Sequence, residues 1–165
     1  VVYKAGEFWM YYYTQAPDYR YPQEPCGLVL KKSTDGIHFG EGIEINRSMS
    51  TMDVKYIPSL KKWVSTYYAE ENQFMQGAKA GVRIAFSDNG VDWDFDYSNE
   101  KMIAQNFDYP INHNPGFIGN ELGQGYETMF LTYGANDLPL TVDGYWFSAA
   151  QYDARQLEWS RITIK

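Results

Sequence analysis

The chain has 165 residues, which is enough for one domain of ordinary size. It carries 14 Lys and Arg against 21 Asp and Glu, a formal net charge of −7, so it lacks the basic surface that nucleic acid and anionic lipid attract. We therefore expect neither nucleic acid nor membrane as a partner. A single cysteine excludes an intrachain disulfide and a thiolate metal cluster, and an aromatic content of 18% favours strands.

A repeat with a period of 54 residues relates the first two thirds of the chain. Trp9 and Trp63 occupy equivalent positions in two aromatic segments, and residues 27–39 match residues 81–93 without a gap. In the second copy we predict strands over residues 54–57, 63–68 and 82–86, with turns over residues 58–61 and 87–90. No convincing amphipathic helix is found.

A third, looser copy follows. Residues 128–133 match the strand that begins at Trp63, residues 144–150 match the strand after Gly81, and residues 153–159 match the turn after it. Residues 161–165 are interpreted as an outer strand.

Repeats of this length with several short strands are typical of propeller blades. We predict an all-β fold, a β-propeller of four-stranded blades with about three blades present, over residues 1–48, 49–107 and 108–165 of a single domain or fragment. We expect the missing blades to come from the rest of a longer polypeptide or from self-association. The alternative is an open β-sandwich of duplicated hairpins.

Two turns of the repeat resemble the Asp-box turn, Ser-x-Asp-x-Gly-x-x-Trp, of sialidase-like propellers. They are Ser33 to Phe39 and Ser87 to Trp93. In such a turn Asp or Asn caps the backbone, Gly adopts an unusual dihedral angle, and the aromatic residue fills the blade. Asp35, Asp88 and Asp92 are therefore predicted to serve the fold.

The second copy resembles the five-bladed glycoside hydrolases of family 43 and their relatives, the furanosidase superfamily. Asp53 opens a short apolar strand that a turn joins to the aromatic strand at residues 63–68, and residues 1–13 resemble the stretch after the first Asp-Pro of that family. The resemblance covers nearly the whole chain and implies inverting hydrolysis of glycosidic bonds in polysaccharides or oligosaccharides. The family uses an Asp base, a Glu acid and a further Asp that tunes the acid. An inverting pair of carboxyl groups lies ~6.5–9.5 Å apart.

On this resemblance Asp53 is the predicted cavity carboxylate, with the cap of a strand start as its alternative. Glu121 and Glu127 are candidate proton donors, and the general base is expected upstream of Val1. Aromatic, amide and other polar residues near the predicted cavity are candidate substrate-binding groups, because flat rings suit the C–H faces of sugars. These candidates are Tyr13, Tyr109, His113, Asn114, Tyr133 and Asp137.

The predicted partner is carbohydrate, and the predicted location is extracellular or periplasmic. We expect no metal site and no cofactor, although the resemblance leaves room for a structural calcium ion. Two other functions stay open. One is a catalytically inactive carbohydrate-binding propeller, and the other is a structural or interaction propeller.

Overall fold

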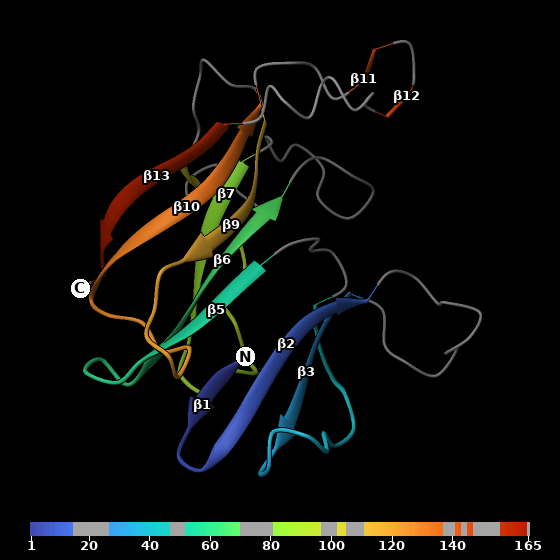
Figure 1. Ribbon diagram of the computed structural model, residues 1–165, viewed down its shortest axis with the longest axis vertical. Coiled ribbons are helices and arrows are strands. Elements are labelled where there is room, and N and C mark those ends of the chain that lie inside the picture. The colour runs from blue at the N-terminus through green and yellow to red at the C-terminus, as the bar shows by residue number, and fades with distance from the viewer. Residues whose placement is uncertain are drawn as a thin grey trace.

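The computed structural model describes residues 1–14, 27–46, 52–69, 81–96, 102–104, 111–136, 141–142, 145–146 and 156–164. All regular secondary structure in this part consists of β-strands, and the strands pair in antiparallel sheets (Figure 1). Among these residues no helix is long and apolar enough to cross a membrane. The all-β prediction is confirmed.

The first sheet has four strands in sequence order. They are β1 (Val2–Lys4), β2 (Glu7–Thr14), β3 (Gly27–Ser33) and β4 (Ile43–Asn46). Ala5 and Gly6 form the two-residue turn between β1 and β2, and both have positive φ. That conformation matches the twist of the paired strands and so fixes their register.

The second sheet repeats this order. Its strands are β5 (Met52–Ile57), β6 (Lys62–Ala69), β7 (Gly81–Ser87) and β8 (Met102–Ala104). The first three confirm the strands predicted at residues 54–57, 63–68 and 82–86.

The third sheet corrects the alignment of the third copy. It consists of β9 (Ile111–Phe117), β10 (Thr128–Asn136) and β13 (Gln156–Thr163), in the order β13-β10-β9. β11 (Thr141–Val142) and β12 (Tyr145–Trp146) pair only with each other among the described strands. The prediction that residues 144–150 form the third strand was wrong, because β13 fills that position along eight paired residues of β10. Residues 161–163 accordingly end β13 and are not a separate outer strand.

The middle sheet packs against a neighbour on each of its two faces. Side chains alternate along β6, so Trp63 lies in the cluster shared with the first sheet and Val64 in the cluster shared with the third. The Trp9 and Trp63 rings meet across the first interface with centroids 4.7 Å apart. The second interface contains Ile57, Val64, Val82, Phe117, Met129, Leu131 and Ile164. Three sheets stacked face to face in chain order differ from a two-sheet sandwich.

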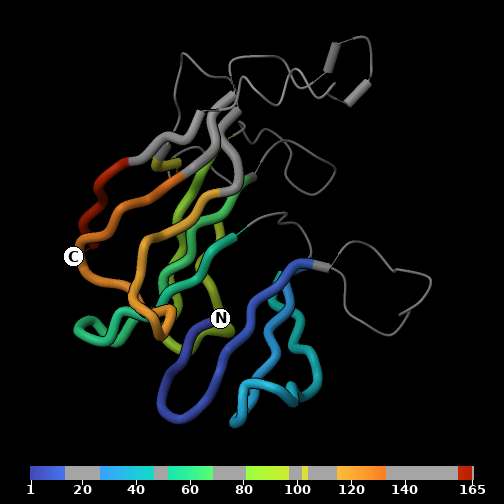
Figure 2. Tube along the Cα trace, in the orientation of Figure 1, coloured from blue at the N-terminus to red at the C-terminus, as the bar shows by residue number. Residues whose placement is uncertain are grey.

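The inner strands of the three sheets come together at one end. Residues 118–127, which connect β9 to β10, reach the first sheet, where the Tyr3 N–H donates to the Leu122 carbonyl at 2.8 Å. The same connection touches the second sheet, because the Gly125 N–H donates to the Tyr56 carbonyl at 2.8 Å. Figure 2 shows this connection at the same end as the turn after β5. Meandering sheets whose first strands converge are blades, so the propeller prediction is confirmed.

The two Asp-box turns are built by the same hydrogen bonds. The Asp35 side chain accepts from two backbone N–H groups at 2.8 Å each, and Asn89 does the same in the second turn. Gly36 and Gly90 follow with φ of +75° and +77°. Asp35 is therefore a fold residue, as predicted.

Candidate functional site

The sheets have two ends, which we name by the inner strands. β5 and β9 begin at the start end, and the connections 58–61 and 118–127 lie at the turn end (Figure 1). Both Asp-box turns follow strands that run from the start end toward the turn end. The fold therefore leaves the start end as the place where Asp53, near the beginning of β5, can meet a ligand.

Asp53 is held by a cation and by the neighbouring sheet. The Lys55 Nζ donates to both Asp53 carboxylate oxygens at 2.7 Å, and the Phe117 N–H of β9 donates to Oδ2 at 2.7 Å. The Asp53 side chain is 28% exposed, whereas that of Lys55 is 12% exposed. The carboxylate thus ties the second sheet to the third while keeping part of its surface open.

Local sequence explains how Lys55 reaches Asp53. Residues two apart on a strand point to the same face, so both side chains lie on the side of β5 that faces the third sheet. Gly119 and Gly125 leave room for the lysine stem, because a Cβ at either position would lie 3.0–3.1 Å from Lys55 carbons. The buried stem and the paired ammonium group fix the orientation of the carboxylate.

This arrangement limits the chemistry available to Asp53. A carboxylate has about four acceptor positions, and the described residues fill three of them at Asp53, which leaves one position at Oδ1 that no described residue fills. The Asp53 side chain accepts hydrogen bonds from the Lys55 ammonium group and from the Phe117 N–H. It is therefore suited to binding a hydroxyl group or facing a developing positive charge. The bond to Phe117 crosses between sheets, which differs from the predicted cap of a strand start.

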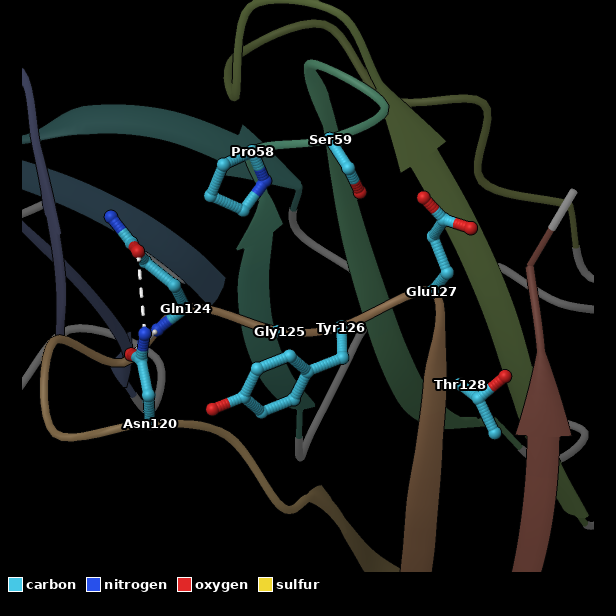
Figure 3. A pocket seen from close by; sticks show the side chains of 8 residues that line it. All are labelled: Pro58, Ser59, Asn120, Gln124, Gly125, Tyr126, Glu127 and Thr128. Atoms are coloured by element: carbon cyan, nitrogen blue, oxygen red, sulfur yellow. Dashed lines mark hydrogen bonds between the residues drawn. The ribbon is translucent and has the colours of Figure 1, made fainter.

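The structure does not bring Glu121 or Glu127 to Asp53. Both glutamates are exposed in the connection 118–127 at the turn end, and Glu127 lines a depression together with Pro58 (Figure 3). Pro58 follows β5 and lies five residues past Asp53, about 17 Å along an extended strand. Among the described residues, no hydrogen bond or ion pair joins either glutamate to Asp53, so their role as proton donors stays a prediction.

Tyr13 is the one predicted substrate-binding side chain that the structure describes. It lies near the end of β2 at the start end, and 44% of it is exposed. Tyr11, two residues earlier on the same face, is half-buried and donates its hydroxyl to the Gly90 carbonyl at 2.8 Å. Burial raises the pKa of Tyr11. An exposed ring at Tyr13 remains available for stacking, whereas Tyr11 serves the interface between the first two sheets.

The other predicted residues are placed only by their backbone, or not at all. His113 and Asn114 lie in β9 and Tyr133 lies in β10, but their side chains are outside the described part. Tyr109 and Asp137 lie outside the described residues. His113 and Asn114 precede Phe117 on β9, so their backbone lies toward the start end from the Asp53 contact.

The strand β9 has a β-bulge at this point. Between the pairs Thr132–Gly116 and Gly134–His113, β9 has one more residue than β10, so Asn114 and Pro115 lie opposite a single residue. Proline lacks the N–H that a ladder needs, so it is confined to such irregular positions inside sheets. Bulges often lie next to active sites, where they redirect side chains. Pro115 was the readable signal for this feature, and sequence reasoning did not use it.

No metal centre is built by the described residues, which contain no group of three or more His, Cys, Asp or Glu placed to hold an ion.

From the sequence alone, Lys55 was not identified as part of the site. Its spacing of two residues from Asp53 on a predicted strand was the available signal, because such residues share a face.

Comparison with known proteins gives similarity in structure only. No protein-family model matches the chain, and no curated protein matches its sequence. One similar solved structure is an N-acetylgalactosamine deacetylase from F. plautii in complex with blood group B trisaccharide. It is 20% identical with a TM-score of 0.49, and the match covers 81% of this chain and 40% of the deacetylase.

A second similar structure is a GH32 β-fructofuranosidase of Bombyx mori. It is 14% identical with a TM-score of 0.49, and the match covers 82% of this chain and 28% of the enzyme. The chain spans less than half the length of either protein.

Proposed function

We propose that the chain is part of a carbohydrate-active propeller protein that hydrolyses glycosidic bonds, with sugar bound at the start end of the inner strands. The observation that carries this proposal is the Asp53 carboxylate, which is fixed by Lys55 and Phe117 and is still partly exposed. The acceptor position at Oδ1 that no described residue fills suits a sugar hydroxyl group. The exposed Tyr13 ring at the same end supplies an apolar face for stacking.

Hydrolysis needs a proton donor and a base in addition to Asp53. Within the described residues, no hydrogen bond or ion pair joins Asp53 to another carboxyl group. We infer that the remaining carboxyl groups come from residues outside this part, such as Asp137, or from further sequence of a longer protein. Asp53 then positions the sugar, while the proton transfers occur at those other carboxyl groups.

The same observation favours a second candidate, a sugar-binding propeller without hydrolysis. A carboxylate that an ammonium group holds in place is a good acceptor for hydroxyl groups. Binding needs only such acceptors and stacking rings, and it needs no second carboxyl group near Asp53.

The test compares two aspartates that each pair with a lysine. Asp53→Asn removes the charge of the carboxylate near the start end but keeps an acceptor for the Phe117 N–H. Asp88→Asn removes an exposed charge that pairs with Lys62 in the second Asp-box turn. Release of reducing ends and heat of binding are measured on a panel of oligosaccharides and plant polysaccharides. Unfolding of each variant is measured in urea, so that loss of fold is recognised.

We expect Asp53→Asn to lower hydrolysis at least 100-fold, with Asp88→Asn unchanged. Full hydrolysis by folded Asp53→Asn contradicts the proposed role of the residue. Sugar binding without hydrolysis in the unaltered protein establishes the second candidate. If sugar is neither bound nor cleaved, the carbohydrate proposal is wrong, and a structural or interaction propeller is the remaining function.

A further inference from the structure

The turn end contains a depression that the proposed function does not use. It has a volume of about 600 Å³ and lies between the turn after β5 and the connection of β9 to β10 (Figure 3). This volume falls within the range of small-molecule sites. The lining residues are Pro58, Ser59, Asn120, Gln124, Gly125, Tyr126, Glu127 and Thr128.

One wall of the depression is fixed by hydrogen bonds. The Asn120 side-chain oxygen accepts from the Leu122 and Gln124 N–H groups at 3.0 and 2.9 Å. The Gln124 amide donates to the Tyr3 carbonyl at 3.0 Å, which anchors the wall to the first sheet. A wall that is already ordered loses little conformational entropy when a ligand binds.

The opposite side presents polar groups that the rest of the described chain does not use. The Ser59 hydroxyl, the Tyr126 hydroxyl and the Glu127 carboxylate are exposed, and the described residues give none of these three a hydrogen-bond or ion-pair partner. Tyr126 is 55% exposed. In Figure 3 the Tyr126 and Pro58 rings lie on two sides of the space, with the Glu127 carboxylate on a third.

We propose that this depression is a second carbohydrate site, which binds one neutral sugar ring of an oligosaccharide. The C–H face of a sugar stacks on the Tyr126 ring, and its hydroxyl groups donate to Glu127 and exchange hydrogen bonds with Ser59. The choice of sugar as the ligand class rests on the proposed function, whereas the site itself is separate from Asp53.

Charge and polarity favour sugar over other ligands. An anion meets the Glu127 carboxylate on a chain with a net charge of −7, so repulsion opposes its binding. A metal cation needs several ligands, and the described residues contain no group of three or more His, Cys, Asp or Glu placed to hold one. A neutral polyhydroxylated ring matches both the donors and the acceptors of this surface.

The test is a titration of the ¹⁵N-labelled protein with lactose, sucrose, cellobiose and xylobiose, followed by NMR at each amide. Tyr126→Ala removes the stacking ring, and Glu127→Gln removes the charge while keeping the shape. The matched controls are Phe130→Ala, an exposed aromatic residue on β10, and Glu41→Gln, an exposed glutamate beyond the first Asp-box turn. Neither control residue lines the depression.

We expect at least one sugar to shift the amides of residues 126–128. Tyr126→Ala should weaken this binding about tenfold and Glu127→Gln about threefold, with both controls unchanged. The inference is overturned if no sugar shifts these amides, or if Tyr126→Ala binds as tightly as the unaltered protein. Acetyl-lysine amide is titrated as a probe that is not a sugar. The inference is also overturned if this probe shifts the amides of residues 126–128 and no sugar shifts them.

Because NMR reports the shift of each amide separately, the titration distinguishes this inference from the proposed function. Sugar-induced shifts confined to the surroundings of Asp53 overturn the second site and support the first. Shifts confined to residues 126–128, and unaffected by Asp53→Asn, support the second site and contradict the first.

Discussion

Gly36 and Gly90 are equivalent glycines of the two Asp-box turns, and they offer a matched pair of substitutions. Their φ angles are +75° and +77°, in the left-handed region that side chains disfavour. Alanine at either position therefore pays the same backbone cost, about 1–2 kcal/mol. Any further difference between the two variants comes from what surrounds each turn.

The side chains around Gly90 lie closer to the glycine than those around Gly36. A Cβ at Gly90 would lie 2.7 Å from the Tyr11 hydroxyl oxygen and 2.9 Å from ring atoms of Trp9 and Trp63, whereas at Gly36 the nearest atom, in the Phe8 ring, is 3.3 Å away. Overpacking a tight interface adds about 1–3 kcal/mol. Gly36→Ala should therefore lower the free energy of unfolding by about 1–2 kcal/mol, and Gly90→Ala by about 2–5 kcal/mol.

Urea unfolding followed by tryptophan fluorescence measures both variants against the unaltered protein. The midpoint of Gly90→Ala should fall further than that of Gly36→Ala, by an amount equal to at least about 1 kcal/mol at a common slope. Equal losses of stability would contradict this prediction, because they would mean that the Gly90 turn is not pressed between the first and second sheets.

Three further predictions test the contacts between sheets and turns. Tyr11→Phe should lower the free energy of unfolding by about 1 kcal/mol in urea, because a cross-sheet hydrogen bond is lost; no change would show that the bond contributes nothing. Hydrogen bonds from the neighbouring imidazole and backbone N–H groups lower the pKa of Asp35, so its stabilisation of the turn should be complete above the unfolded-state pKa of about 4 and should decline progressively as pH falls further below that value. The side chain that caps the second turn, Asn89, does not titrate, so the amide exchange rates of the first turn should rise relative to those of the second turn in acid, and a constant ratio of the rates contradicts this assignment. Lys55→Met should cost about 1.5–3 kcal/mol in urea unfolding, because Asp53 then keeps a half-buried charge without its cation; an unchanged midpoint would show that the pair does not stabilise the fold.

The repeat explains why the first two sheets could be predicted. Trp9 and Trp63 recur at one spacing together with their strands and turns, and each local signal agrees with the same sheet order. The Asp-box turns are equally readable, because serine, Asp or Asn, and glycine make their hydrogen bonds within a few residues. Short-range chemistry of this kind is visible in a single sequence.

The third sheet and the site could not be read in the same way. Insertions in the third copy separate β10 from β13, so matching aromatic residues assigned the wrong segment to the third strand. The bond between Asp53 and Phe117 joins residues 64 positions apart and depends on how two sheets stack. Glu127 was chosen as a carboxylate near a predicted cavity, but the connection that carries it crosses to the turn end.

The most direct test of the carbohydrate proposal is a crystal structure of the protein with a bound oligosaccharide that it is found to bind or cleave. We expect sugar at the start end, with a hydroxyl group within hydrogen-bond distance of the Asp53 carboxylate and with Lys55 still paired to that carboxylate. Sugar that is bound elsewhere, with Asp53 covered by protein, would contradict this expectation.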